Sequence, residues 1–396
     1  RRKKIEEHNK KSERFIKGMS MTAVKFGISF TTRFLNQANA MVIVHQDGTL
    51  QVATGATEMG QGVNARIAEM VASELGLDRD NVRMMPTRTD KNANTSPTAA
   101  SSGTDLNGAA ALLAVRKIKY RLSHLATQLF EVPEEKWARN TAGLGTAPEL
   151  NVDQLPFSND PNEGADWPTG IATFAGVNFD KGHVSLEAAP DKKISFKDLV
   201  VEAYLNRVSL SDYAHYKIPG IEFNKLEGKG DAFLYFTQGV ALSEVTIDKD
   251  TGAFKIDSSK ILMDLGRPVN KDLDLGQVSG AFTQGVGWVT SENLFYNDQG
   301  LLLSHAPSTY KIPNAQDTPR KYEIELLEND ENYMNVRGTK AVGEPPLLLG
   351  ISVWTAIQNA LSYIHKDYPC VHIHATNERI LRAIDPNSFS KWESNK

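Results

Sequence analysis

The sequence predicts an α+β fold in which mixed sheets pack against helices. Alternating apolar residues over 240–247, followed by a turn at 250–252, predict antiparallel strands. Apolar residues also recur at helical spacing, as in Val63, Ile67 and Met70. Because the strands and helices do not alternate as βαβ units, a parallel α/β sheet is not indicated.

The individual elements follow from the same two periodicities. Segments rich in β-forming residues predict strands over 26–34, 40–44, 50–53, 240–247, 253–256 and 258–264. Helical spacing predicts helices over 63–75, 110–122, 278–286 and 347–361. The first stretch, 1–14, is highly charged and predicts an amphipathic or frayed helix that leads into a fold begun earlier. We therefore expect a fragment or one piece of a larger assembly.

A change in composition divides the chain into three parts. Residues 138–189 are rich in Asn, Asp, Pro, Gly and Thr, with scattered apolar pairs, which predicts a surface insertion with a small hairpin. We expect a first part with glycine loops over 1–137, the insertion over 138–195 and a second part over 196–396.

The composition of the 396 residues excludes several classes of protein. A hydrophobic content of 40% is ordinary for a folded protein, and a net charge of −4 gives no sign of nucleic-acid or membrane-surface binding. The single cysteine, Cys370, excludes a disulfide framework and a cysteine-ligated iron–sulfur cluster made by this chain alone, and it fits a reducing cytoplasm. The longest apolar run, 347–357, is too short to cross a bilayer.

Two loops and one carboxylate carry the candidate chemistry. The glycine-rich segment 55–62 precedes a predicted helix, so its backbone N–H groups suit an anion. The small residues of 94–104 leave the backbone accessible to a flat polar ligand. Glu344 lies before two prolines that begin another helix, where the helix dipole favours a carboxylate and burial beside an anion opposes it. This balance suits a general base.

Each of these features also has an ordinary structural interpretation. The glycine segment 55–62 is compatible with a plain turn into a helix. The Ser/Thr-rich loop 94–104 is compatible with an N-cap, and Glu344 is compatible with a capping glutamate. A Walker phosphate loop is excluded because no Gly-Lys-Ser/Thr ending follows the glycines. The nine histidines, with His372 and His374 expected on a strand, do not indicate a metal site, and no G-x-S-x-G elbow indicates a serine hydrolase.

Taken together, several motifs resemble the molybdenum hydroxylase family, specifically the C-terminal part of the molybdenum-binding region of the xanthine dehydrogenase group. They occur in the family's order and span most of the chain: KFGISF at 25–30, FLNQ at 34–37, ATEMGQG at 56–62, SPTAAS at 96–101, TDLNG at 104–108, GQVSGAFTQG at 276–285, PSTYKIP at 307–313 and KAVGEPP at 340–346. Ala56, Gly103 and Ala306 depart from residues that are common in the family.

The resemblance implies the fold of the molybdopterin-binding domain and assigns roles to individual residues. The molybdenum is expected on the dithiolene of the pterin, with no amino-acid ligand to the metal. The implied cofactor contacts are Met59, Gly60, Gln61, Ala100, Ser101, Gln284 and Gly343. Glu344 matches the catalytic base, and the implied substrate contacts are Phe30, Thr31 and Leu35.

The resemblance further implies hydroxylation of purines, hypoxanthine and xanthine to urate, with water as the oxygen source. Aldehyde oxidation, or hydroxylation of another N-heterocycle, remains an alternative, as does a noncatalytic cofactor-binding or assembly subunit. The 2Fe-2S clusters, the FAD and the other half of the cofactor domain are expected on other domains or chains. We therefore expect a cytoplasmic hetero-oligomer in which this chain alone is inactive.

Overall fold

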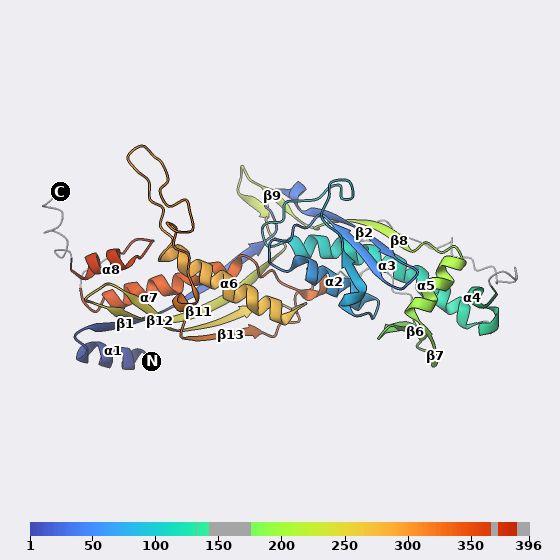
Figure 1. Ribbon diagram of the computed structural model, residues 1–396, viewed down its shortest axis with the longest axis horizontal. Coiled ribbons are helices and arrows are strands. Elements are labelled where there is room, and N and C mark those ends of the chain that lie inside the picture. Colours follow the sequence, from blue (N-terminus) through green and yellow to red (C-terminus); the bar gives the residue numbers. More distant parts are fainter. Residues whose placement is uncertain (132, 142–175, 366–370, 386–396) are drawn as a thin grey trace.

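The computed structural model describes residues 1–131, 133–141, 176–365 and 371–385, and it forms an elongated molecule of two lobes (Figure 1). Lobe A contains the sheet β1-β11-β12-β13, and lobe B contains the sheet β4-β3-β2-β8. Each lobe has its own buried apolar cluster. The chain crosses from one lobe to the other several times, so the boundary between them is built from segments far apart in the sequence.

Lobe A is built on a long antiparallel pair. Strand β1 (Phe15–Ile28) pairs with β11 (Tyr235–Asp248) over fourteen residues, and β12 (Phe254–Asp264) and β13 (Lys321–Leu327) complete the sheet. Helices α6 (Lys271–Val289) and α7 (Ile351–Leu361) pack on this sheet. Their apolar faces supply its core, so the sheet and the two helices stabilise one another.

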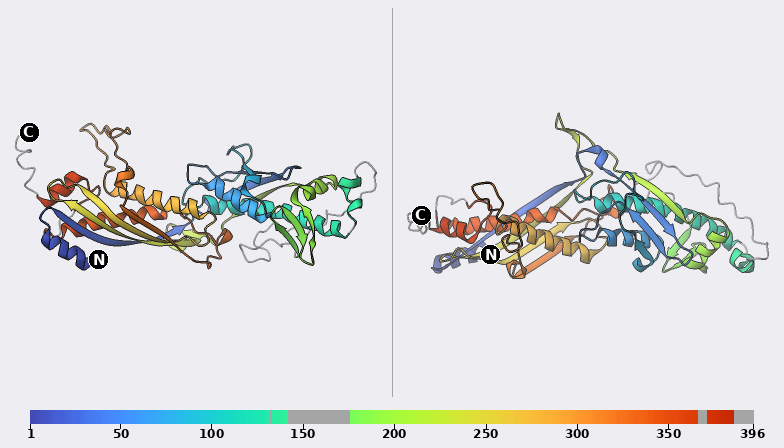
Figure 2. Two further views of the ribbon diagram at one scale, coloured as in Figure 1. Left: turned by 60° about the horizontal axis from the view of Figure 1, so that its bottom comes forward. Right: turned by 45° about the horizontal axis from the view of Figure 1, so that its top comes forward.

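The remaining elements of lobe A lie around this core. Helix α1 (Arg2–Lys11) packs beside β1, and Asn9 bonds both backbone groups of Lys17 on that strand. Helix α8 (Asn377–Ile384) buries Ile380 in the same core. Between α6 and β13 the chain projects away from the lobe as the orange-brown loop in Figures 1 and 2. This loop exposes several large apolar side chains, Leu294, Phe295, Tyr296, Leu301, Leu303 and Ile312.

Lobe B places one long helix across a four-stranded sheet. The strands are β2 (Gln37–Val44), β3 (Leu50–Thr54), β4 (Val82–Met84) and β8 (Ser211–Lys217). The helices that cover them are α2 (Val63–Glu74), α3 (Gly103–Phe130) and α5 (Phe196–Leu205). Alanines and leucines of α3 are almost completely buried because this helix contacts the sheet, α2 and α5.

Smaller elements flank lobe B. Strands β5 (Val177–Asp180), β6 (His183–Leu186) and β7 (Ala189–Ser195) form a three-stranded antiparallel sheet, and Val184 and Ile194 join the core of the lobe. Helix α4 (Ala138–Thr141), β9 (Glu222–Asn224) and β10 (Lys229–Asp231) are short. Residues 142–175 of the predicted insertion and Cys370 lie outside the described residues, and the three-part division remains a prediction.

The structure confirms most predicted elements and corrects several. A strand over 26–34 is wrong: β1 ends at Ile28, since Ser29 has a positive φ of 113° and Asn36 bonds both backbone groups of Phe30, closing a loop. Residues 253–256 and 258–264 are one strand, not two. The last predicted helix starts as a 3₁₀ turn, Pro345–Gly350, and becomes α-helical only at Ile351.

No helix within the described residues is both long and apolar enough to cross a membrane.

At the lobe boundary, neighbouring residues belong to different cores. Ala341 belongs to the core of lobe B and the next residue, Val342, to the core of lobe A. Phe26 packs against both. The segment before Glu344 is therefore held between the two cores.

Close packing of α6 against the 3₁₀ turn Pro345–Gly350 gives a first prediction. A Cβ on Gly285 would overlap the carbonyl oxygen of Leu347, whereas a Cβ on Gly280 of the same helix would meet nothing within 4 Å. We expect Gly285→Ala to lower the free energy of unfolding by about 1–3 kcal/mol through overpacking. Gly280→Ala should raise it by roughly 0.5–1 kcal/mol by restricting the unfolded chain.

Urea unfolding of the two variants and the unmodified chain measures both effects. Equal stabilities of Gly285→Ala and Gly280→Ala would contradict the proposed contact between α6 and the turn.

Candidate functional site

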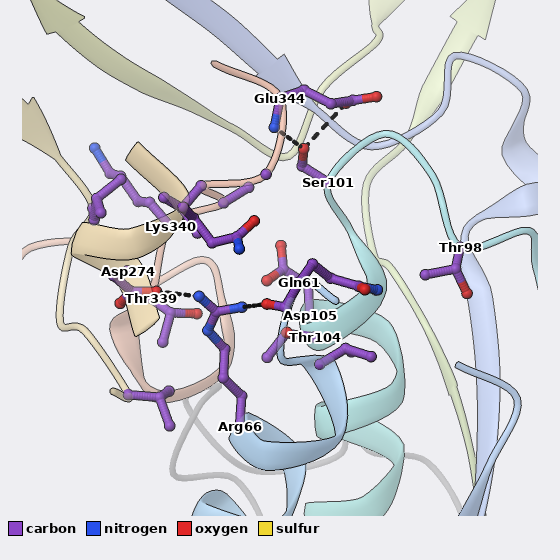
Figure 3. A pocket seen from close by; sticks show the side chains of 18 of the residues that line it. Gln61, Arg66, Thr98, Ser101, Thr104, Asp105, Asp274, Thr339, Lys340 and Glu344 are labelled. Carbon is purple, nitrogen blue, oxygen red and sulfur yellow. Dashed lines mark hydrogen bonds and ion pairs between the residues drawn. The ribbon is translucent and has the colours of Figure 1, made fainter. Parts of the chain in front are cut away.

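Three segments meet at the lobe boundary and enclose a cavity of about 250 Å³. They are the glycine loop 55–62, the loop 94–102 before α3 and the segment 339–344 before Pro345. The first turn of α6 closes the remaining side. The polar side chains among its lining residues are Gln61, Arg66, Thr98, Ser101, Thr104, Asp105, Asp274, Gln277, Thr339, Lys340 and Glu344 (Figure 3).

The glycine loop is held by its own glutamate. The Glu58 carboxylate accepts backbone N–H bonds from Gly60, Gly62 and Asn64 at 2.9–3.0 Å. Burial alone would raise the pKa of Glu58, but these N–H groups outweigh it and hold the pKa below its usual range. Glu58 therefore takes the amides that the sequence suggested for an anion, and it fixes the shape of the loop.

The loop before α3 is strained and has free donors. Ala100 and Ser101 both have φ of 54°, a left-handed conformation that costs a non-glycine residue on the order of 1–3 kcal/mol. Their backbone N–H groups donate to no acceptor within the described residues. Strained consecutive residues with unpaired amides beside a cavity are typical of a ligand clamp. Ser102 occupies the N-cap position of α3, as the N-cap interpretation predicted, but its side chain makes no capping bond.

Glu344 is bound to the same loop. The Ser101 hydroxyl accepts the Glu344 backbone N–H at 2.8 Å and donates to its Oε2 at 3.1 Å. Although Glu344 is the N-cap residue of the 3₁₀ turn, its side chain makes no capping bond, so the capping interpretation is wrong. The carboxylate is exposed and held at one end of the cavity (Figure 3).

A buried ion pair forms the opposite end of the cavity, as Figure 3 shows. Arg66 Nη2 lies 2.5 Å from Asp274 Oδ1, and Arg66 Nη1 donates to the Gln61 carbonyl at 2.8 Å. Burial raises the pKa of Asp274 although Arg66 opposes that shift. The pair joins α2 of lobe B to α6 of lobe A and orients the carbonyl of Gln61.

A buried carboxyl forms part of the cavity wall. Asp105 Oδ2 accepts the Tyr235 hydroxyl at 2.6 Å, and the same hydroxyl accepts the Ala341 N–H at 2.9 Å. Burial raises the pKa of Asp105 to about 6, against the opposing hydrogen bonds of Tyr235 and Asn335. This chain of bonds connects α3, β11 and the segment that leads to Glu344.

Comparison with known proteins identifies the family of the chain. A model of the molybdopterin cofactor-binding domain matches residues 1–151 and 171–319. The chain belongs to this family. The xanthine dehydrogenase of Oryza sativa subsp. japonica is 33% identical over 99% of this molybdopterin-binding chain, and the xanthine dehydrogenase/oxidase of Gallus gallus is 34% identical over 99%. The chain spans about a quarter of each relative, 25% and 26%.

Solved structures agree on the fold. CO dehydrogenase from Oligotropha carboxidovorans superimposes with a TM-score of 0.70 at 20% identity, over 100% of this chain and 43% of its own. Quinoline 2-oxidoreductase from Pseudomonas putida 86 gives 0.71 at 21%, over 97% and 43%. The predicted α+β fold of a molybdenum hydroxylase cofactor domain is confirmed.

In this molybdopterin-binding domain most of the predicted cofactor contacts lie together. Met59, Gln61, Ser101, Gly343 and Glu344 line the cavity. Gly60 and Ala100 lie in the same two loops. A Cβ on Gly343 would sit 3.2 Å from Ser101 Oγ, which is why a residue without a side chain suits that position.

The other predicted site residues lie elsewhere. Gln284 is on the exposed side of α6, and Gln277 of that helix lines the cavity instead. Phe30, Thr31 and Leu35 are half-buried in the loop after β1, outside the cavity lining. That loop adjoins the Ser101 loop, because Ser96 Oγ donates to the Gln37 carbonyl at 2.9 Å. Their predicted roles stay predictions.

Sequence analysis missed Arg66, Asp105, Asp274, Gln277 and Lys340, all of which line the cavity. Arg66 had a usable signal, since it is a charge within the apolar face that contains Val63 and Ile67. Among the described residues no cluster of His, Cys, Asp and Glu is suited to a metal ion. His372 and His374 lie in irregular chain, so their expected strand is wrong.

The buried carboxyl of Asp105 gives a prediction about pH. Its folded-state pKa of about 6 lies above the ordinary value of 3.8, so the folded state holds an extra proton between these pH values. The contribution of Asp105 to the free energy of unfolding is therefore largest at low pH and is lost as the pH rises through about 6. Between pH 4 and 7 this loss should lower the free energy of unfolding by about 2 kcal/mol.

Asp105→Asn keeps an acceptor for Tyr235 and cannot titrate, so it is the matched control. Urea unfolding at several pH values should show the unmodified chain losing stability relative to the variant. Parallel pH profiles for the two proteins would disprove the assignment.

Proposed function

We propose that this chain holds the molybdenum–pterin cofactor and supplies the general base, Glu344, in a xanthine dehydrogenase-like hydroxylase. One observation supports this most directly: Ser101 of the strained loop bonds both the backbone and the carboxylate of Glu344. The base and the free amides that suit the cofactor are thereby fixed to one another. Geometry of this kind is what general-base catalysis requires.

The described residues fit this cofactor. The cavity lies between loops whose free N–H groups at Ala100 and Ser101 suit the polar edge of a pterin or a phosphate. A cofactor that carries its metal on its own sulfurs needs no cluster of protein ligands. When bound, the group supplies a Lewis-acidic metal and takes up the two electrons that the substrate loses.

The chain's own residues perform three tasks in this proposal. The Glu344 carboxylate accepts a proton from the water-derived oxygen that attacks the substrate. Ser101 orients that carboxylate through the bond to Oε2 and fixes its backbone through the N–H. Glu58 keeps the glycine loop in one conformation, so Met59 and Gln61 are presented to the cofactor without reorganisation.

The proposed substrates are purines, hypoxanthine and xanthine, because the relatives of 32–36% identity are named xanthine dehydrogenases. Phe30, Thr31 and Leu35 are proposed to contact the substrate ring from the loop beside Ser101. Aldehyde oxidation is the second candidate, since aldehyde oxidoreductases of Desulfovibrio share the fold at 18–19% identity. A noncatalytic assembly subunit is disfavoured by the carboxylate of Glu344 at the cavity.

Further chain is proposed to complete the active enzyme. The chain corresponds to about a quarter of the length of its curated relatives. We propose that the other half of the cofactor domain, the 2Fe-2S clusters and the FAD lie on other domains or subunits of a cytoplasmic hetero-oligomer. This chain by itself is then inactive.

Replacing the proposed base tests the mechanism. In the complete enzyme, Glu344→Gln should retain molybdenum and slow substrate oxidation by about 10²–10⁴-fold, because the general base is lost. Single-turnover reduction by substrate, with metal analysis of the same sample, measures both. Glu325→Gln on β13, also exposed, is the matched control and should react normally. A near-normal rate for Glu344→Gln would refute the assignment.

A substrate panel separates the candidate functions. The complete enzyme should oxidise xanthine and hypoxanthine faster than nicotinate or benzaldehyde, since relatives of 32–36% identity are named xanthine dehydrogenases. Initial rates under one electron acceptor decide the order. A preference for benzaldehyde would favour the aldehyde oxidase alternative, and a purified complex without molybdenum would favour the noncatalytic one.

A further inference from the structure

The hydroxyl of Tyr235 lies where the two lobes meet. Tyr235 begins β11, pairs with Ile28 at the end of β1 and is buried, with 7% of its surface exposed. Its hydroxyl donates to Asp105 Oδ2 at 2.6 Å and accepts the Ala341 N–H at 2.9 Å. Both the donor and the acceptor capacity of the hydroxyl are therefore used, and each partner is buried.

The two partners belong to the segments that carry the proposed site. Asp105 lies in the first turn of α3, four residues after Ser101. Ala341 precedes Glu344 by three residues. The Tyr235 hydroxyl thus links the side chain of Asp105, four residues after Ser101, to the backbone of Ala341, three residues before Glu344.

A second bond reinforces the same peptide. Thr237 lies two residues further along β11, on the same face of the strand, and its hydroxyl donates to the Ala341 carbonyl at 2.9 Å. One strand therefore holds both the N–H and the C=O of Ala341. Before this residue, Lys340 is fixed by its N–H to the Leu265 carbonyl and by its ammonium to Asp264.

Beyond Ala341 the segment is fixed by packing more than by hydrogen bonds, because Val342 lies in the core of lobe A. Among the described residues, 342–344 are hydrogen-bonded through the two contacts between Glu344 and Ser101 and through the bond from Leu347 N–H to the Glu344 carbonyl. Hydrogen bonds therefore fix Glu344 through two anchors, Ala341 on one side and the loop of Ser101 on the other. Tyr235 and Asp105 connect those anchors.

We propose that Tyr235 and Asp105 are positioning residues that hold Glu344 at the correct place relative to the cofactor loop. They act through the Ala341 peptide and through the first turn of α3, and neither touches the substrate. The inference rests on the proposed function of Glu344 as the base. A hydrogen bond to a carboxylate is short and strong, which suits it to such a link.

Tyr235→Phe in the complete enzyme tests the link, since it removes one oxygen and keeps the ring. We expect the rate of substrate oxidation at saturation to fall about 10–100-fold, with KM changed less than twofold and molybdenum content unchanged. Amide hydrogen exchange over 339–344 should accelerate at least tenfold, with or without bound molybdenum. An unchanged rate together with unchanged exchange would overturn the proposal.

A matched variant separates positioning from a general loss of stability. Tyr322→Phe removes another largely buried hydroxyl, which bonds the Ser279 carbonyl, and should leave the rate and the exchange of 339–344 unaltered. An equal loss of rate in Tyr322→Phe would overturn the link.

A double substitution separates this inference from the proposed function. In the Glu344→Gln background, Tyr235→Phe should cause no further loss of rate, because it acts through the carboxylate. Additive losses would overturn the inference alone. A normal rate for Glu344→Gln by itself would instead refute the proposed function. If Tyr235→Phe does not fold, Thr237→Val provides the test, with faster exchange at 339–344 and a rate lowered at least threefold expected, and no change in either contradicting the proposal.

Discussion

The pairing of β1 with β11 is the constraint on which the rest of the structure depends. It joins residues 15–28 to residues 235–248, so the chain must return over more than two hundred residues to form it. The last pair, Ile28 with Tyr235, lies at the boundary between the lobes. This pairing therefore delivers the loop after β1, the Tyr235 hydroxyl and the peptide of Ala341 to one place.

Two loops that differ in their hydrogen bonding line the resulting cavity. In the glycine loop Glu58 accepts the N–H groups of Gly60 and Gly62, and Gln61 accepts that of Met59, so the conformation of the loop does not depend on a ligand. The loop of Ala100 and Ser101 keeps its amides free and its backbone strained. The glycine loop is thus stable without a ligand, while the loop of Ala100 and Ser101 keeps free N–H donors. This is expected where the binding geometry is set before the ligand arrives.

Local patterns in the sequence predicted most elements and identified the loops that line the cavity. They failed where a distant partner decides the outcome. Glu344 and Ser102 both have the local pattern of caps, but neither side chain caps a helix, and Glu344 bonds Ser101, 243 residues away. Tyr235 likewise meets Asp105 across 130 residues. No periodicity or motif in one sequence contains such long-range contacts.

The left-handed backbone at Ala100 and Ser101 has a thermodynamic consequence for cofactor loading. Because the empty protein already has that conformation, its free-energy cost lowers the stability of the fold and is not subtracted from the affinity of a ligand that binds it. A ligand that binds the folded form alone raises the free energy of unfolding, and this increase grows with the logarithm of the ratio of ligand concentration to Kd once that ratio is large. Cofactor loading and thermal stability are therefore linked in this domain. A partially loaded preparation should contain two populations that melt at different temperatures.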